Sequence, residues 1–365
     1  MTERSVALNS FGSKIGSLMK KNVPFVILIF LLILFSFIAP NFMTFGNIRT
    51  LVRQISFAGI SAVGLMFVMI SGGIDLSIGS QIVFSNVLLA IMMADWKLPL
   101  GAAIPLIMLV GTGLGLINGL LYIKLKIAPL IITLGTSAIF KGFGYIINHS
   151  RNIMGFPDAF RWFGQGYVGG IPVPVIVMVV VALIGSFILT KTYFGRKVFA
   201  LGGNEEAARL AGVNVDKMKV ILFMICGFVS SITTVLLLSR VFAGQTITGQ
   251  GLEFDCLTAA LLGGVSFKGG EGTIFGLMVG ILIIGVLNNA MQLASFPDFS
   301  QTVVKGTVLL IAVAFDVYQK KRKAKVNVAS VSALKIRFSC LQESHIVGFF
   351  FYLRLSDEGS GHQRF

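Results

Sequence analysis

Long apolar runs alternate with short polar stretches along most of the chain, and this pattern predicts membrane-spanning helices. Most runs hold about 20 residues, the length that a helix needs to cross a hydrocarbon core of about 30 Å. The apolar residues follow one another without the alternation that a lipid-facing barrel strand requires. The predicted fold class is therefore all-α, a polytopic transmembrane bundle of about ten spans. The predicted spans are residues 24–39, 50–70, 76–94, 99–122, 129–148, 171–190, 217–239, 254–267, 273–293 and 302–318.

The eighth run, residues 254–267, is short for a span and predicts a broken or re-entrant segment. Prolines punctuate the chain near the ends of the other spans, where a residue without a backbone N–H does the least damage. They are Pro24, Pro40, Pro99, Pro129, Pro172 and Pro297.

The composition agrees with a membrane protein, because 55% of the residues are hydrophobic and only 12% are charged, against about 25% charged in soluble domains. The net charge of +15 does not indicate nucleic-acid binding, since the cations lie in short loops and near the ends. With ten spans, the basic segments fall on one side. That side is predicted to be cytoplasmic, with both chain ends there. The basic segments are the N-terminal leader, Lys124 and Lys126, residues 191–219, and residues 320–323.

This orientation divides the chain into three parts. Residues 1–23 form a cytoplasmic leader, and residues 24–318 form the transmembrane domain with a cytoplasmic loop at 191–217. Residues 319–365 combine a basic start with a Ser-, Gly- and charge-containing tail, which predicts a disordered appendage.

Enzyme motifs are absent from the sequence. It contains no phosphate-binding Gly-x-x-x-x-Gly-Lys-Ser/Thr loop, and its three histidines and three cysteines are scattered without metal-ligand or disulfide spacing. We therefore expect no catalytic residues, no metal site and no cofactor bound by this chain. Any ATP would be bound by a partner.

A polar stretch at residues 195–213 interrupts the apolar pattern and predicts a short helix. Asn204 can cap the start of this helix, and Glu205 and Glu206 suit its first turn. Arg209 follows Glu205 at i+4, and Gly212 can end the helix after Leu210. A charged helix held at one membrane face predicts a contact with another protein.

Two further segments place polar groups at membrane depth. The sequence Gly-Gly-Ile-Asp-Leu-Ser at 72–77 puts Asp75 and Ser77 between two spans with almost no loop, and Asp75 is predicted to cap the following helix. Residues 262–272 form a second glycine-rich break, preceded by Glu253 and Asp255, which are predicted to cap a helix at the outer mouth.

Three asparagines within apolar spans, Asn118, Asn288 and Asn289, are predicted to join helices by hydrogen bonds or to contact substrate. Residues 115–121 also resemble residues 285–291. The two stretches lie on predicted spans of opposite direction, which is typical of a five-plus-five inverted repeat.

The stretch 195–213 and the 72–77 sequence closely resemble the coupling loop and the signature of ribose- and arabinose-type sugar permeases, the membrane subunits of bacterial ATP-binding-cassette importers. The resemblance covers roughly residues 24–316. It implies monosaccharide import across the plasma (inner) membrane of a bacterium, with residues 204–212 bound to a cytoplasmic ATPase. It also implies an extracytoplasmic sugar-binding protein, a second permease copy and a place on the translocation path for the polar residues. These are Asp75, Ser77, Asn118, Glu253, Asp255 and Asn288.

Two other transport functions remain open. One is a related permease for branched-chain amino acids or nucleosides. The other is an ion-coupled secondary transporter that uses Asp75 as its proton site, although this hypothesis leaves the 195–213 helix without a role.

Overall fold

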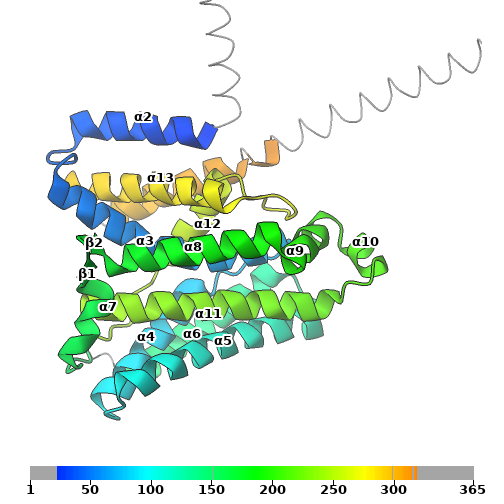
Figure 1. The fold of residues 1–365 in the computed structure, drawn as a ribbon, viewed down its shortest axis with the longest axis horizontal. Helices are drawn as coiled ribbons and strands as arrows, with labels where there is room; N and C mark the ends of the chain where they lie inside the picture. The colour runs from blue at the N-terminus through cyan, green and yellow to red at the C-terminus, as the bar shows by residue number, and fades with distance from the viewer. Residues whose placement is uncertain (1–22, 150, 298, 315, 319–365) are drawn as a thin grey trace, which may run out of the picture. The chain divides into compact units, whose positions relative to one another are not determined.

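A computed structural model describes residues 23–149, 151–297, 299–314 and 316–318 (Figure 1). The predicted leader, apart from residue 23, and the predicted tail lie outside the described residues. Each of the ten predicted spans coincides with one helix to within a few residues. These helices are α2 (Val23–Ile38), α3 (Phe45–Ile70), α4 (Ile78–Ala94), α5 (Leu100–Leu125), α6 (Pro129–Asn148), α8 (Val173–Lys191), α11 (Val215–Val241), α12 (Leu252–Leu262), α13 (Ile274–Leu293) and a last helix, Phe299–Tyr318.

The connections contain additional short elements. A 3-10 helix η1 (Asp158–Phe160), α7 (Arg161–Gln165) and a hairpin of β1 (Tyr167–Val168) and β2 (Ile171–Pro172) lie between α6 and α8. Two helices, α9 (Tyr193–Gly203) and α10 (Glu205–Leu210), lie between α8 and α11. The short helix predicted from Asn204 to Gly212 is α10, whereas α9, which precedes it and ends at Gly203, was not predicted.

Among the described residues, seven helices are long and apolar enough to cross a membrane, and Pro24–Ile38 and Ile78–Ala94 are shorter apolar helices. The eighth predicted span is the 11-residue α12, which confirms the prediction of a short segment. One proline was not anticipated inside a span, because Pro105 lies within the second turn of α5.

The helices differ strongly in how much of their apolar surface is covered. In α3, 78% of the apolar window is buried, against 22% in α8. Helix α3 therefore lies inside the bundle, while α8 exposes isoleucine, leucine and phenylalanine side chains. Such an exposed apolar surface is expected where a helix faces lipid or another membrane protein.

Side-chain contacts fix the directions of the central helices. Ser61 of α3 bonds to Thr233 of α11, and Gly64, further along α3, lies against Val229. Residue numbers that increase along α3 therefore pair with residue numbers that decrease along α11. Along the same helix, Asn47 bonds to Asn289 and Gly59 lies near Ile281 of α13. Helices α11 and α13 therefore both run antiparallel to α3.

Helix α5 runs antiparallel to α11, because Gly111, Gly115 and Gly119 lie against Gly227, Phe223 and Val220 in that order. It follows that α5 and α13 run in opposite directions. This confirms the direction predicted for the two similar stretches at 115–121 and 285–291. The inverted repeat itself stays a prediction.

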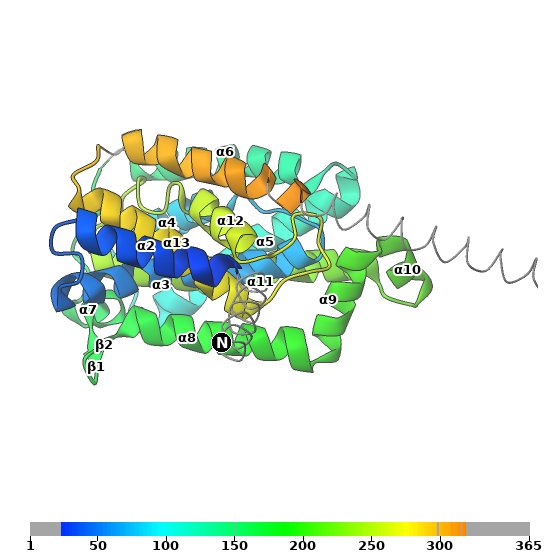
Figure 2. The same cartoon turned by 90° about the horizontal axis from the view of Figure 1, so that it is seen from above.

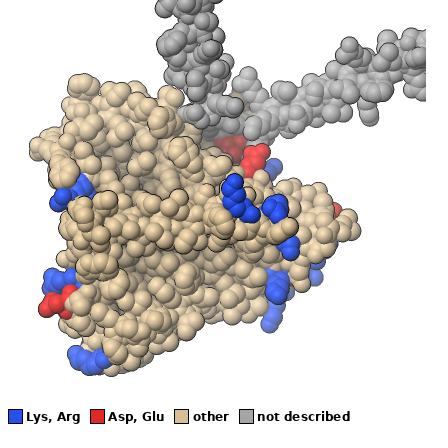
Figure 3. Space-filling view, viewed as in Figure 1, with Lys and Arg blue, Asp and Glu red and all other residues tan. Residues whose placement is uncertain are grey.

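The connections gather at two opposite ends of the bundle (Figures 1 and 2). The α7 end carries the hairpin, and Asp95 and Arg151 form an ion pair there. The α10 end carries α9 and α10 together with the end of α5, since Lys219 lies over the ring of Tyr122 at 4.6 Å. Lys and Arg side chains appear at both ends, with an uncharged band between them on the face shown in Figure 3.

The α5–α11 contact depends on glycines, and it yields a stability prediction. A Cβ on Gly115 would overlap with the carbonyl oxygen of Phe223, whereas a Cβ on Gly113 meets nothing within 4 Å. Gly115→Ala is expected to destabilise the bundle by about 1–3 kcal/mol, because the backbones must separate. Thermal melting of the detergent-solubilised protein measures the effect. Gly113→Ala is the matched control, and an equal response of the two variants would contradict the close approach.

Candidate functional site

The first break in the bundle separates α3 from α4. Helix α3 ends at Ile70, and its last carbonyl groups accept hydrogen bonds from the N–H groups of Ser71, Gly72 and Gly73. Gly72 has φ +85°, a conformation that glycine adopts without steric cost. The chain then continues without helix to Ser77 and re-enters the bundle as α4.

Asp75 lies in this break and is fully buried. Its Oδ1 accepts hydrogen bonds from the backbone N–H of Ser77 at 2.8 Å and from the Ser77 hydroxyl at 2.5 Å. Its Oδ2 accepts from Gln81 Nε2 at 3.3 Å. The prediction that Asp75 caps α4 is wrong, because Ser77 is the N-cap residue and makes no side-chain cap bond. The carboxylate instead holds the turn that precedes the helix.

The hydrogen bonds of Asp75 extend into a network that joins three helices, hereafter the Asp75 network. Ser77 Oγ accepts from Asn118 Nδ2 of α5 and from Gln81 Nε2 of α4, both at 2.7 Å. Thr133 of α6 donates to the carbonyl of Ile74 and accepts from the N–H of Leu76, at 3.2 Å each. The structure thus brings together Asp75, Ser77 and Asn118, and the bond from Asn118 of α5 to Ser77 is of the helix-joining kind predicted for this asparagine.

The Asp75 network is polar without being an ion pair. Within the described part of the chain, Asp75 has no salt bridge. The buried oxygens Gln81 Oε1 and Asn118 Oδ1 have no hydrogen-bond partner among those residues. Since buried polar atoms are normally satisfied, these two acceptors are available to a water molecule or a hydroxylated ligand.

The second break, between α12 and α13, lies directly against the first. The N–H of Gly270 donates to the carbonyl of Ile70 at 2.8 Å. Gly202 at the end of α9 lies at the same point, because a Cβ there would overlap with the Ile70 carbonyl oxygen and lie 2.5 Å from the Gly270 nitrogen. The end of α9 therefore contacts both breaks at once.

Glu253 and Asp255 occupy the first turn of α12, and neither is its N-cap. The N-cap residue is Gly251, whose φ of +83° suits glycine, so the predicted capping role is wrong for both acids. Asp255 Oδ2 instead accepts from Lys305 Nζ at 3.0 Å and from Asn288 Nδ2 at 3.2 Å. These two bonds join α12 to α13 and to the last helix, and they confirm the predicted helix-joining bond of Asn288.

Glu253 lies at the start of α4. A Cβ on Gly79 would overlap with the Glu253 carboxylate, and Glu253 Oε2 is a buried atom without a hydrogen-bond partner among the described residues. The first turn of α12 thus lies between the Asp255 pair on one side and the beginning of α4 on the other.

The α9 and α10 helices project at the α10 end (Figure 1). Asn204 Oδ1 accepts from the N–H of Ala207 at 2.9 Å, which confirms the predicted cap, and Gly212 with φ +82° follows the end of α10. Glu205 pairs with Arg209 at 3.5 Å and with Lys219 of α11 at 2.8 Å. The first pair lies within α10, and the second joins α10 to α11.

One apolar side chain on α10 is left uncovered. Leu210 is 90% exposed, and Tyr193 at the start of α9 is 79% exposed. Neither side chain is covered by the described part of the chain, so each is free to contact another protein.

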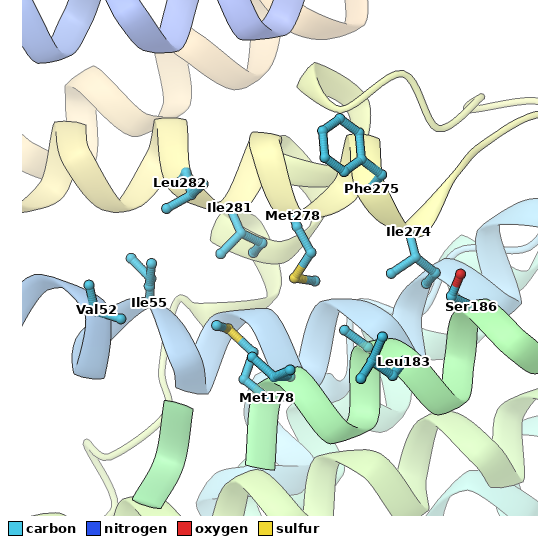
Figure 4. A pocket seen from close by; sticks show the side chains of 12 residues that line it. Val52, Ile55, Met178, Leu183, Ser186, Ile274, Phe275, Met278, Ile281 and Leu282 are labelled. Atoms are coloured by element: carbon cyan, nitrogen blue, oxygen red, sulfur yellow. The ribbon is translucent and has the colours of Figure 1, made fainter. Parts of the chain in front are cut away.

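Two cavities lie near these elements, and they differ in chemistry. The larger, about 470 Å³, lies between α3, α8 and α13, and its walls are almost entirely aliphatic, with Met178 facing Met278 (Figure 4). The smaller, about 180 Å³, includes Asp255, Asn288 and Lys305 among its lining residues. Only the smaller one offers several hydrogen-bonding groups to a ligand.

Three residues that hydrogen-bond to the predicted site residues or to the backbone beside them were not anticipated from the sequence. Gln81 could have been found, because it follows Ser77 at i+4 on one helical face. Thr133 and Lys305 carry no such local signal, since their partners lie 57 or 59 and 50 residues away in the sequence.

Comparison with known families gives a match over most of the chain. The family described as "Branched-chain amino acid transport system / permease component" matches residues 47–313. No solved structure matches the chain.

Individual relatives are similar over nearly their whole length. The chain is 38% identical to the ribose import permease protein RbsC of Haemophilus influenzae, covering 85% of this chain and 97% of the relative. It is 42% identical to the Bacillus subtilis ribose import permease protein RbsC, covering 82% and 93%. It is also 42% identical to the L-arabinose transport system permease protein AraH of Escherichia coli, covering 79% and 87%.

Proposed function

Because the chain belongs to the family of branched-chain amino acid transport system permease components, we propose that it is the membrane-spanning subunit of an importer that carries a monosaccharide into the cytoplasm. A separate ATP-hydrolysing subunit supplies the energy. The observation that carries the proposal is the contact of α9 with both helix breaks, because it links an exposed surface at one end of the bundle to the buried polar residues.

The names of the relatives support a sugar as the substrate. Two are ribose import permeases and one is an L-arabinose permease. The Asp75 network also suits a neutral solute, because its free groups are amide oxygens rather than charges that would pair with an amino acid. A pentose or a related hexose fits this chemistry.

The proposal includes three protein partners. The ATPase binds α9 and α10, with Asn204, Glu205, Glu206, Arg209, Leu210 and Gly212 at the contact. A sugar-binding protein delivers substrate at the α7 end, which faces away from the cytoplasm. A second copy of the permease, together with lipid, covers apolar helices such as Phe299–Tyr318, of whose apolar window only 6% is buried.

Movement of α9 and α10 by the ATPase would shift the two breaks together, since α9 touches the carbonyl of Ile70 and Gly270 beside it. Two groups of polar residues would then line alternately accessible parts of the path. One group is Asp75 and Ser77 of the first break with Asn118 of α5, and the other is Glu253 and Asp255 of α12 with Asn288 of α13. The chain moves its solute and does not transform it.

Leu210→Asp tests the proposed function. A charge at this 90% exposed apolar position is expected to weaken ATPase binding at least about tenfold, because a buried hot-spot contact is typically worth 2 kcal/mol or more. Co-purification of a tagged permease with its ATPase, and ATP-dependent ribose and arabinose uptake into vesicles, measure the effect.

Leu210→Met is the matched control, since it keeps an apolar side chain of similar size. Glu205, Glu206 and Arg209 changed together to alanine provide a second test, although this variant also frees α10 from Lys219. Assembly and uptake unchanged in Leu210→Asp and in the triple variant would refute the coupling role of α10.

The proposal also fixes the orientation of the chain, and cysteine labelling tests it. Cys226 and Cys256 are buried, so after Cys340→Ser, single cysteines can be introduced as Arg209→Cys and Val168→Cys. A membrane-impermeant thiol reagent is expected to label position 168 in intact spheroplasts and position 209 only after permeabilisation, because the positive-inside rule places α10 in the cytoplasm. Labelling of position 209 from outside would overturn the orientation and the proposed function with it.

A further inference from the structure

The smaller cavity lies between α3, α12, α13 and the last helix, and its polar lining comes from all four. Six polar side chains line it: Gln54, Asp255, Asn288, Gln292, Gln301 and Lys305. The remaining wall is mostly aliphatic, with Ile55 and Ile281 among its members. A cavity with convergent polar groups on an otherwise apolar wall is the usual form of a small-molecule site.

The charges in the cavity cancel. Lys305 Nζ lies 3.0 Å from Asp255 Oδ2, so the two side chains form an ion pair and leave no net charge for a ligand to balance. The other four polar groups are amides, and each amide can both donate and accept a hydrogen bond. Asn288 Oδ1 is buried and has no partner among the described residues. This set suits an uncharged ligand with several hydroxyl groups.

The size of the cavity restricts the ligand further. Its volume of about 180 Å³ lies well below the roughly 300–1,000 Å³ of pockets for drug-sized ligands. A single sugar ring is a ligand of the right scale, and an oligosaccharide is too large.

The mouth of the cavity lies toward the α7 end. Gln292 is at the end of α13, and Gln301 donates to the carbonyl of Phe296 in the connection that follows. Asn289, three residues before Gln292, bonds to Asn47 in the first turn of α3. Asp255 and Asn288 lie deeper, and beyond Asp255 the first turn of α12 reaches the start of α4 through Glu253.

We propose that this cavity is a monosaccharide-binding site of the permease itself, which receives the sugar at the α7 end before it passes the helix breaks. The inference rests on the proposed function and extends it. Gln54, Gln292 and Gln301 form the mouth, and Asn288 with the Asp255–Lys305 pair forms the floor.

Binding of radiolabelled ribose and L-arabinose to the permease–ATPase complex in nanodiscs, without the sugar-binding protein, tests the site. Asn288→Leu is expected to weaken sugar binding about tenfold or more, because it removes the free Oδ1 acceptor and the Nδ2 group that holds Asp255, without opening a void. Gln54→Ala alters the half-exposed mouth and leaves the buried contacts among the floor residues unchanged. It is expected to weaken sugar binding severalfold. Met278→Leu, on the wall of the larger aliphatic cavity, is the matched control and is expected to bind as the parent protein does.

The possible outcomes distinguish a failure of the proposed binding site from a failure of the proposed transport function. Normal ATPase co-purification with weakened sugar binding in both variants supports the site. Normal binding and uptake in folded Asn288→Leu and Gln54→Ala would overturn the site while the importer function stands. Import of leucine, with no import of either sugar, by the parent protein would overturn the proposed function itself.

Discussion

Gly202→Ala is expected to reduce ATP-driven sugar uptake about tenfold or more while the ATPase stays bound. The added methyl group would overlap with the carbonyl oxygen of Ile70, which is also the acceptor for Gly270. Helix α9 would have to move away from both breaks, and a movement of the ATPase would then no longer reach them. The exposed face around Leu210 is untouched by the change. ATP hydrolysis should therefore continue without stimulation by the sugar-loaded binding protein.

Gly203→Ala is a closely matched control. Gly203 is the neighbouring residue of the same helix, and a Cβ there meets nothing within 4 Å. Alanine raises helix propensity by up to about 1 kcal/mol at either position, so a difference between the variants reports the contact and not the helix. Vesicle uptake and ATP hydrolysis, measured side by side, give the ratio of the two rates. Equal coupling in both variants would rule out transmission through this contact.

Asp75→Leu is expected to eliminate uptake and to lower the yield of folded permease. The carboxylate accepts from the Ser77 N–H, the Ser77 hydroxyl and Gln81, all in the buried break. Each buried donor left without an acceptor costs about 1–3 kcal/mol. Both Ser77 donors are left so, while Gln81 keeps its bond to Ser77 Oγ, and the sum is a large part of the stability of many domains. Size-exclusion chromatography and vesicle uptake measure the two effects.

Asp75→Asn is expected to retain substantial ATP-dependent uptake. Asparagine keeps the oxygen that accepts both Ser77 bonds, and Gln81 can turn its unpartnered Oε1 toward the new amide group. A proton-coupled transporter would respond differently, because an amide cannot titrate. Loss of uphill uptake with sugar exchange intact would favour an ion-coupled mechanism over an ATP-driven one.

The fold was largely predictable because membrane helices are specified locally. The length and continuity of each apolar run fixed ten helices, and Asn204 and Gly212 marked the bounds of α10 because capping involves only neighbouring residues. The polar residues of the breaks were also identifiable, since few such groups occur at membrane depth.

The partners of these residues were not predictable in the same way. Asp75 stands where a capping residue is expected, but its oxygens are taken by Ser77 and Gln81. Asp255 pairs with Lys305, and Gly202 meets Ile70, across long stretches of chain. Such contacts depend on how helices pack against one another, and periodicity along a single helix does not encode packing.

The shortness of α12 has a consequence for how the protein is made. Its 11 residues rise only about 17 Å at 1.5 Å per residue, about half of the hydrocarbon core, and the segment begins with two acidic residues. During synthesis it therefore cannot be integrated by the translocon as an independent span on the strength of its own hydropathy. We expect α12 to stay at the membrane interface until α13 and the last helix have been translated, when Lys305 becomes available to neutralise Asp255. Truncation of the nascent chain before Lys305 is then expected to leave α12 outside the bilayer, because these helices would enter as a group and not one at a time.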